Sequence, residues 1–511
     1  MASHNQAPSA GASRVAPVLP CLLLGLCLTL LPGPLRAAPP ADLPALTALE
    51  AKGAATAGLI VDLERGKVLA AHAPDRALIP ASVVKLATAG RALEAWGPGW
   101  RFTTSLLRRG ALKEGTLSGD LVLRGGGDAS ITDEDLWRMA RSLAQRGLKE
   151  VTGGVIVDEG LFGRIACNVA DRCDAEARSE NAYDAPLSAT PVDYNSLALT
   201  VVADAEEGQA AQLLLEPYDL PDVAVEGSVT TADGPTQLSL ERVSQGAQNN
   251  LLVSGSLPPG KTLTLYRSLA EPAHYAGTLF RAFLEQAGIR IDGAVAVSEQ
   301  PVAGAEPLLD YQGAELARAI DLMLTYSNNL QADTLALDLQ RRLQPDQPPS
   351  LAAAGRLLEA HVAGAADGSA FPAPAGAPAP RLADGSGLDP ADRLTARQLV
   401  QLLEQGYRRT ETFPSLLGAL TVPANGPQTT LPAPGGAGAS AADGNWNRRI
   451  MVKTGGLGVP VSVTSLAGYF RFKDGGWGAF AFLVNGAPDR PISRADAFSA
   501  MRRDLSRHWK R

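Results

Sequence analysis

Ser82 and Lys85 stand three residues apart in the segment IPASVVKLATAGRALEAW, residues 79–96. A serine hydroxyl is a weak nucleophile until a base takes its proton. Residues three apart share one face of a helix, so the lysine can reach the serine. An ordinary lysine, with a pKa of about 10.4, becomes a base only when burial or a second cation lowers that pKa. Taken alone, the pair is more simply a capping serine and a solvated lysine.

A second candidate is the pair Ser327 and Asn329 in the segment TYSNN, residues 325–329. Two residues apart on a continuous helix, their side chains would point to different faces, so they can act together only if the helix breaks there. Serine and asparagine are residue types that favour such turns. On its own, the segment is more simply a helix cap.

A third candidate is the segment KTGG, residues 453–456, at the end of the predicted strand RRIMV. Lys453 supplies a cation and Thr454 a hydroxyl, while Gly455 and Gly456 leave the backbone N–H groups approachable. This combination suits a substrate that carries a carboxylate. A turn that ends the strand is the alternative interpretation.

The three motifs, in the order SxxK, SxN and KTG, resemble those of the serine enzymes that recognise penicillin, which include the serine β-lactamases. The long interval between the first two motifs, GDLVLRGGGD at residues 119–128 and DGSGL at residues 384–388 make the chain similar to one family in particular. This is the D-Ala-D-Ala carboxypeptidase/endopeptidase family of class C low-molecular-mass penicillin-binding proteins. The resemblance implies the α+β class: a penicillin-binding, β-lactamase-like transpeptidase domain interrupted by a large β-rich insertion.

The resemblance also implies catalytic roles for five residues. Ser82 would be the acylated nucleophile, with Lys85 as its base. Ser327 would relay a proton to the leaving amine, with Lys453 supporting it electrostatically. Asn329 would orient the substrate amide. The activity implied is that of an exported serine DD-peptidase that removes D-Ala from D-Ala-D-Ala and that could also cleave peptide cross-links.

By the same resemblance, the substrate-binding residues are those of the KTG strand and one carboxylate. Thr454 would bind the terminal carboxylate of D-Ala, beside Gly455, and the backbone N–H groups of Ser82 and Gly456 would form an oxyanion hole. Many relatives carry a threonine where this chain has Gly456, so a hydroxyl is lost but the backbone donor is kept. Asp158 would receive the free amine of the stem peptide; a solvated loop aspartate is the simpler account of that residue.

Length and composition indicate how these motifs must be carried. A chain of 511 residues is too long for one ordinary core, and its 52 Gly, 37 Pro and 19% charged residues favour many strands and long connections. We expect a catalytic domain from residues 39–103 and 302–511. The region 104–301 would be the β-rich insertion, and it is long enough to form two nested domains.

Hydrophobic patterns predict the elements that position the motifs. Residues 56–71 indicate a strand hairpin, and the helix that starts at Ala81 is ended by Gly97 and Pro98. Three strands, RRIMVKTGG, VTSLAGYFRF and WGAFAFLVNG, are predicted near the end. Further helices are predicted at residues 133–146, 273–287, 314–342 with a break at TYSNN, 395–407 and 493–509. The Ala/Pro/Gly-rich segments 363–380 and 422–445 are predicted loops.

The first forty residues have the layout of a secretory signal peptide, here residues 1–38: Arg14, an apolar run at residues 18–31, and then Ala37 and Ala38. That run is shorter than the roughly 20 residues that span a bilayer. We therefore expect a periplasmic protein whose association with the membrane is at most peripheral. Cys167 and Cys173 could form a disulfide there, with two buried thiols as the alternative.

The charge pattern and the histidines limit the alternatives. A net charge of −7 and the lack of a Lys/Arg-rich run in the sequence disfavour nucleic acid as a partner. The five histidines are scattered without metal-ligand spacing, so we expect no metal site, no cofactor and no Ser-His-Asp triad. The expected partners are peptidoglycan stem peptides, with β-lactam antibiotics as covalent inhibitors. A serine β-lactamase, or a catalytically silent cell-wall binding protein of the same fold, are the alternatives.

Overall fold

The computed structural model describes residues 40–424 and 448–508. The predicted signal peptide at residues 1–38 and most of the predicted loop at residues 422–445 lie outside the described residues. None of the helices in the described part of the chain is long and apolar enough to cross a membrane.

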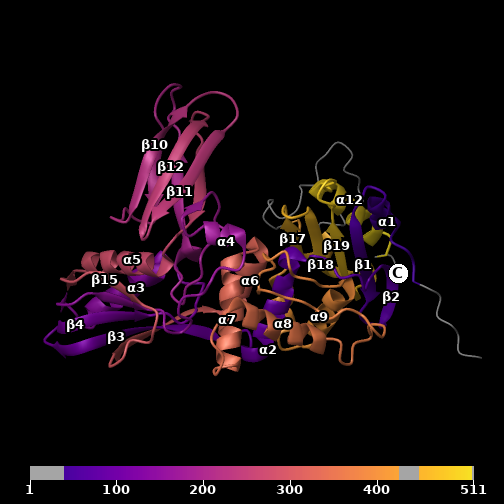
Figure 1. Ribbon diagram of the computed structural model, residues 1–511, viewed down its shortest axis with the longest axis horizontal. Coiled ribbons are helices and arrows are strands. Elements are labelled where there is room, and N and C mark those ends of the chain that lie inside the picture. The colour runs from indigo at the N-terminus through magenta and orange to yellow at the C-terminus, as the bar shows by residue number, and fades with distance from the viewer. Residues whose placement is uncertain (1–39, 425–447, 509–511) are drawn as a thin grey trace, which may run out of the picture. The chain divides into compact units, whose positions relative to one another are not determined.

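A five-stranded antiparallel sheet joins the two ends of the described chain (Figure 1). The first predicted hairpin and the three predicted C-terminal strands are all present. The first strand of the hairpin pairs along its whole length with the last strand, from Ala55 opposite Asn485 to Asp62 opposite Gly478. In spatial order the strands are β17 (Ile450–Leu457), β18 (Val463–Arg471), β19 (Trp477–Asn485), β1 (Ala55–Asp62) and β2 (Lys67–His72).

Helices cover both faces of this sheet, so its three inner strands, β18, β19 and β1, are buried on both faces. Phe480 and Phe482 of β19 face one hydrophobic core, built with α1 (Pro44–Glu50) and α12 (Arg494–Leu505). The intervening Ala479 and Ala481 face a second core, built with α2 and α9. Successive residues of a strand point to opposite faces, so this one strand holds both layers in place.

The helix that carries Lys85 lies at the centre of the second layer. A short 3₁₀ turn, η1 (Ala81–Val84), leads into α2 (Lys85–Trp96), and Gly97 ends the helix with φ 75°, as its sequence predicts. Its neighbours are α6 (Leu316–Tyr326), α7 (Asn329–Leu343), α8 (Leu351–Gly364), α9 (Ala396–Arg408) and α10 (Phe413–Gly418). Of these, α8 and the short α10 have no counterpart among the predicted helices, whereas the helical segments 314–342 and 395–407 are confirmed.

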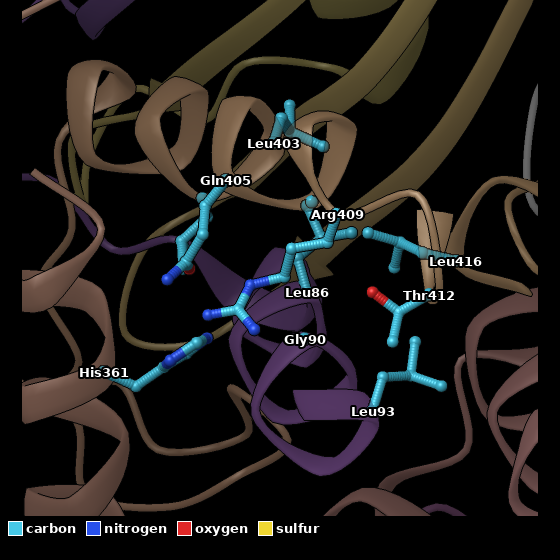
Figure 2. A pocket seen from close by; sticks show the side chains of 11 residues that line it. Leu86, Gly90, Leu93, His361, Leu403, Gln405, Arg409, Thr412 and Leu416 are labelled. Atoms are coloured by element: carbon cyan, nitrogen blue, oxygen red, sulfur yellow. The ribbon is translucent and has the colours of Figure 1, made fainter. Parts of the chain in front are cut away.

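Beside α2 lies a cavity of only about 20 Å³, lined by Leu86, Leu93, His361 and Arg409, among others (Figure 2). Such a volume holds about one water molecule. The Glu94 carboxylate lies 3.3 Å from Nδ1 of His361 and 2.7 Å from Nη2 of Arg409. The hydrogen bond with His361, above all, lowers the pKa of Glu94 to about 2. The ion pairs of Glu94 therefore hold α2 in place, and the cavity beside them is too small for a substrate.

The chain between β2 and α6 adds three further sheets. The largest, of seven strands, packs against α3 (Asp133–Gln145) and α5 (Pro272–Gln286), which confirms the two helices predicted there. Its strands are β3 (Arg101–Lys113), β4 (Thr116–Arg124), β5 (Glu150–Val151), β6 (Val155–Asp158), β14 (Arg290–Ile291), β15 (Val295–Ser298) and β16 (Glu306–Glu315). β3 extends across the expected limit at residue 103, and its partner β16 lies wholly beyond the expected limit at residue 302. The domain limits therefore stay a prediction.

The other two sheets are smaller. The four-stranded sheet consists of β10 (Val223–Thr231), β12 (Gln248–Leu257), β11 (Gln237–Gln245) and β7 (Arg178–Ser179). The three-stranded sheet consists of β13 (Thr262–Ser268), β8 (Ser196–Val202) and β9 (Gln212–Glu216). Between the large sheet and these two, a disulfide joins Cys167 to Cys173 around the short helix α4 (Ala170–Asp174), so the cysteines are paired rather than free thiols.

Candidate active site

Ser82 and Lys85 are brought together as their spacing predicts. Ser82 lies on the η1 turn and is partly exposed, whereas Lys85, the first residue of α2, is completely buried. Nζ of Lys85 lies 3.0 Å from Oγ of Ser82 and 2.7 Å from Oδ1 of Asn329. It also donates to the backbone carbonyl of Ser386 at 2.7 Å. The amine is therefore surrounded by polar atoms on the protein side and touches the serine on the other.

The helix break required by the second motif is present at Ser327. This residue caps α6 in the left-handed conformation, with φ 58°, and α7 starts two residues later at Asn329. A non-glycine residue in this region is uncommon and often marks a functional site. The break turns both side chains toward the lysines, since Nζ of Lys453 donates to Oγ of Ser327 at 2.8 Å.

The third motif lies on β17, an edge strand of the central sheet. Lys453 is 1% exposed and donates to Ser327 and to the carbonyl of Thr454, the latter at 2.7 Å. Thr454 is also buried, with 7% of its surface exposed. The strand packs directly against η1, so the KTG residues and the serine face one another across a short gap.

The two glycines after Thr454 differ in the space around them. A Cβ atom on Gly455 would lie 2.2 Å from Oγ of Ser465, 2.8 Å from the carbonyl of Pro80 and 3.0 Å from the backbone nitrogen of Ser82. A Cβ atom on Gly456 would have 3.4 Å to its nearest neighbour, a nitrogen of Arg494. Gly455 is therefore required for the close approach of β17 to Ser82, whereas Gly456 is not required by packing.

Burial lowers the pKa values of both lysines. It brings the pKa of Lys85 to about 8; Asp333 and Asp384 oppose this shift and Arg172 reinforces it. The pKa of Lys453 lies well below its usual range because of burial and, next, the positive charge of Lys85. An amine in water resists deprotonation, but an amine removed from water prefers its neutral form. Lys85 can thus accept a proton from Ser82 near neutral pH.

The DGSGL segment, which carried only the resemblance in the sequence, supplies a direct contact to the lysine. The Asp384 carboxylate accepts from the backbone N–H groups of Ser386 and Gly387, at 3.0 and 2.7 Å. This turn fixes the Ser386 carbonyl that receives Lys85. The contact was missed because a backbone carbonyl leaves no signal in residue types.

The structure contradicts the prediction for Asp158. This residue ends β6 inside the insertion and is 1% exposed. Its carboxylate accepts from Nε of Arg124 at 2.7 Å and from the backbone N–H groups of Val302 and Gly160 at 3.0 and 2.9 Å. Because the Asp158 carboxylate is buried and already accepts these three hydrogen bonds, it is not a solvated loop group and is not available to a substrate amine.

A cavity of about 780 Å³ opens beside the second motif and was not foreseen from the sequence. Residues 326–329 line part of it, and the insertion supplies the other lining residues. Nδ2 of Asn329 donates to the carbonyl of Tyr183 at 3.2 Å, so the insertion reaches the motif directly. The insertion contributes Tyr183, Asp193, Tyr194, Glu216 and Tyr266, among others. These residues are scattered over the sequence, and only the fold gathers them.

Comparison with known proteins finds relatives that are D-alanyl-D-alanine carboxypeptidases. The chain is 32% identical to the D-alanyl-D-alanine carboxypeptidase of Actinomadura sp. (strain R39) over 297 residues, which is 56% of this chain and 54% of that relative. This match thus spans about half the length of that enzyme. The chain is 24% identical to D-alanyl-D-alanine carboxypeptidase DacB of Haemophilus influenzae over 438 residues, or 83% and 84% of the two chains.

Solved structures show a similar fold. Penicillin-binding protein 4 (dacB) from Haemophilus influenzae matches with a TM-score of 0.70 at 21% identity, over 91% of this chain and 99% of that one. The same protein complexed with a novel β-lactam matches with a TM-score of 0.68 at 22% identity. At this identity the likeness concerns the fold alone. It confirms the predicted fold class, a penicillin-binding-protein fold with a large insertion.

A family model decides the membership of the chain. The model of the D-Ala-D-Ala carboxypeptidase 3 (S13) family matches residues 41–505, which include all three motifs and the DGSGL segment. The match also spans the whole insertion, so the insertion belongs to the family architecture. The protein is thus a member of the D-Ala-D-Ala carboxypeptidase 3 (S13) family.

Proposed function

We propose that this protein is an exported, periplasmic serine DD-peptidase that hydrolyses the D-Ala-D-Ala end of peptidoglycan stem peptides through an acyl-enzyme on Ser82. The observation that carries the proposal is the buried amine of Lys85, 3.0 Å from the Ser82 hydroxyl and with its pKa lowered to about 8. Activated nucleophiles need a base matched to the working pH, and this pair provides one.

In the acylation step, neutral Lys85 takes the proton of Ser82 while Oγ attacks the carbonyl carbon of the penultimate D-Ala. The backbone N–H groups of Ser82 and Gly456 stabilise the oxyanion. The peptide C–N bond then breaks, and the leaving amine takes its proton through Ser327, which Lys453 holds at 2.8 Å. Water afterwards hydrolyses the ester. Ser327 gives its hydroxyl proton to the leaving amine and is reprotonated by the Lys85 ammonium, so the one proton removed from Ser82 is matched by the one that the leaving group receives.

The substrate fits along β17. This strand lies at the edge of its sheet, and beyond Val452, which pairs with Thr421, an extended peptide can pair with its outer edge. Thr454 would bind the terminal carboxylate, and Arg494, whose guanidinium nitrogen lies near Gly456, adds positive charge at the same place. Asn329, already bonded to Lys85, would orient the substrate amide.

The cavity beside Ser327 supports cleavage of cross-links as well as of free D-Ala-D-Ala ends. Its volume of about 780 Å³ leaves room for a second peptide on the leaving-group side of the serine. Tyrosine and carboxylate side chains from the insertion line it, and these can contact a polar peptide. The same acyl-enzyme chemistry would release either D-Ala or a cross-linked peptide, and β-lactams would act as covalent inhibitors of Ser82.

Replacement of the nucleophile tests the proposal. Ser82→Ala should lower hydrolysis of a D-Ala-D-Ala stem peptide by at least about 10³-fold, because without the serine hydroxyl no acyl-enzyme can form. The fold should persist, since one hydroxyl at a helix start contributes about 0.5–2 kcal/mol. Ser142→Ala, on α3 of the insertion, is the control and should keep full activity. Hydrolysis by a folded Ser82→Ala variant would refute the assignment.

The pH dependence of acylation follows from Lys85. The base must be neutral, so the rate should rise as the pH passes upward through about 8, the pKa of Lys85. For a single group this gives about a tenfold increase in rate between pH 7 and pH 9. Stopped-flow measurement of peptide or β-lactam acylation provides the profile. A rate that is flat over this interval would contradict a base with this pKa.

The two glycines of the third motif form a matched pair. Gly455→Ala places its Cβ against Pro80 and the Ser82 backbone nitrogen, and it should slow acylation by about 10²–10³-fold, comparable to loss of an oxyanion donor. Gly456→Ala meets nothing closer than 3.4 Å and should stay near the wild-type rate. Covalent labelling by a fluorescent penicillin measures both. Equal rates for the two variants would show that β17 does not press on Ser82.

A further inference from the structure

The insertion contributes a buried cation, Arg172, to the surroundings of Lys85. Arg172 of α4 is 2% exposed, and its Nη2 donates to Oδ2 of Asp333 at 2.7 Å. Asp333 is completely buried on α7, one helical turn after Asn329, so both side chains leave α7 on the same face. Asn329 holds Lys85, and Oδ1 of Asp333 accepts from the backbone N–H of Gly385 at 2.9 Å.

A second link runs from the same segment to the DGSGL turn. Nη1 of Arg172 donates to Oδ1 of Asn168 at 2.9 Å, and Nδ2 of Asn168 donates to Oδ2 of Asp384 at 3.2 Å. Asp384 fixes the turn whose Ser386 carbonyl receives Lys85. The insertion therefore reaches the catalytic amine along two routes, one through α7 and one through the DGSGL turn.

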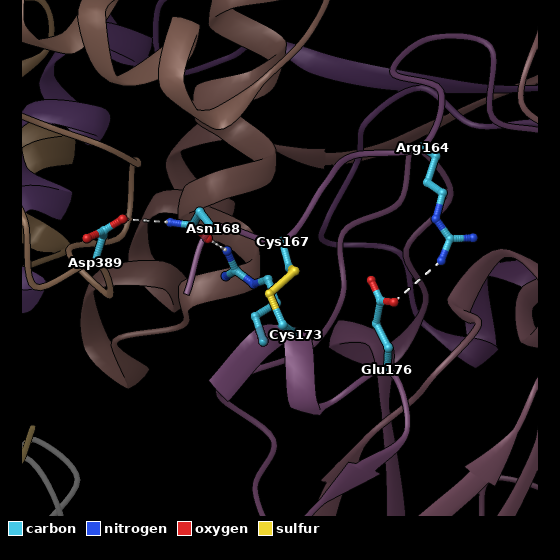
Figure 3. Close-up of a disulfide and its surroundings, with 7 residues drawn as sticks. Arg164, Cys167, Asn168, Cys173, Glu176 and Asp389 are labelled. Atoms are coloured by element: carbon cyan, nitrogen blue, oxygen red, sulfur yellow. Dashed lines mark hydrogen bonds and ion pairs between the residues drawn. A yellow bond between two sulfur atoms is a disulfide. The ribbon is translucent and has the colours of Figure 1, made fainter. Parts of the chain in front are cut away.

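The disulfide encloses the two residues that make these links. Cys167 precedes Asn168 and Cys173 follows Arg172, and Figure 3 shows Asn168 beside the disulfide with its side chain directed toward Asp389. The helix within this loop, α4, spans only residues 170–174 and is too short to be stable by itself. The cross-link limits the conformations of the loop and so keeps both side chains in place.

Arg172 also balances the charges that act on Lys85. The carboxylates of Asp333, Asp384 and Asp392 raise the pKa of this lysine, whereas Arg172 lowers it. The charge of Lys453 lies nearby as well, since Lys85 lowers the pKa of Lys453. Without Arg172, the buried carboxylate of Asp333 would lose its ion-pair partner next to the catalytic amine. The charge and the geometry of Arg172 therefore act on the same group.

We infer that Arg172 is a positioning residue for the catalytic base: the disulfide-bonded segment 167–173 of the insertion holds Asp333 and the DGSGL turn, and through them Lys85, in place for proton transfer from Ser82. This inference rests on the proposed role of Lys85. It gives the insertion a part in catalysis that does not require contact with the substrate.

The test is the acylation rate constant with benzylpenicillin from pH 6 to pH 10. Arg172→Met should be at least about tenfold slower at pH 7, with the rising limb of the profile moved to higher pH, because it removes the positive charge that lowers the pKa of Lys85 and leaves the Asp333 carboxylate without its buried partner. The double variant Arg172→Met/Asp333→Asn removes both charges and should return to within about threefold of the wild type, with its limb restored.

Arg397→Met is the matched control. Arg397 makes two hydrogen bonds to Asp75, at 2.6 and 3.0 Å, in the catalytic layer, but neither residue acts on Lys85. This variant loses an ion pair of the same kind and should keep the wild-type rate and profile. If Arg172→Met fails to fold, Cys167→Ser/Cys173→Ser decides instead, because it keeps every charge and only releases the loop. It should acylate at least about threefold more slowly.

Three results would overturn the inference. The first is a wild-type rate and profile in folded Arg172→Met, or a wild-type rate in the disulfide variant where that one decides. The second is a slow Arg172→Met with an unmoved limb and no recovery in the double variant, which would make Arg172 only structural. Both leave the proposed function intact if the wild type itself is acylated. The third is a wild type that benzylpenicillin does not acylate, which would remove the proposed function and this inference together.

Discussion

The removal of one amine from water is the constraint on which the rest of the site depends. Lys85 is completely buried, and burial lowers its pKa to about 8. A buried charge is costly unless it is paired, so the surroundings determine how much of the amine is neutral. Here the nearest atoms are the Ser82 hydroxyl, the Asn329 side-chain oxygen and the Ser386 carbonyl. They hold the amine by hydrogen bonds, and the carboxylates of Asp333 and Asp384 lie close enough to raise its pKa but do not offset the effect of burial.

The architecture around this amine follows from that requirement. Each of its contacts comes from a different part of the chain, and the elements must meet without admitting water. The central sheet brings β17 against η1, where Gly455 lets the strand approach the Ser82 backbone. The left-handed Ser327 ends one helix and the next begins at Asn329, so that one segment serves both lysines. The insertion contributes Arg172, which forms a buried ion pair with Asp333. Asp333 lies one helical turn from Asn329.

Much of this site could be predicted from the sequence because its chemistry resides in short motifs. The Ser82 and Lys85 spacing, the helix break at Ser327 and the strand that carries Lys453 are local features, and all are present. What depends on distant contacts could not be predicted. The Ser386 carbonyl, the Tyr183 carbonyl and the Arg172 side chain meet the motifs only after folding, and their residue types give no hint of it. The burial of Asp158 could not be predicted for the same reason, since the residue type does not reveal that Arg124 and two backbone N–H groups occupy its carboxylate.

The same distinction applies to the fold. The hairpin at residues 56–71, the last three strands and most helices have clear periodicity, and each was predicted near its observed limits. Helix α8 was missed because it is apolar on several sides and contains Gly355, whose added Cβ would lie 2.1 Å from the carbonyl of Leu382. The glycine that weakens the helical pattern is the one that allows α8 to pack. Tertiary contact therefore overrides local propensity there.

The intact mass of the purified mature protein during incubation with benzylpenicillin tests the central claim most directly. The account predicts a single, persistent adduct that maps to the peptide containing Ser82, because Lys85 activates this serine and the acyl-enzyme would be hydrolysed slowly. Consumption of the antibiotic without a lasting adduct would indicate a serine β-lactamase. An unmodified protein with the antibiotic intact would indicate a silent binding protein, and either of these results would contradict the account.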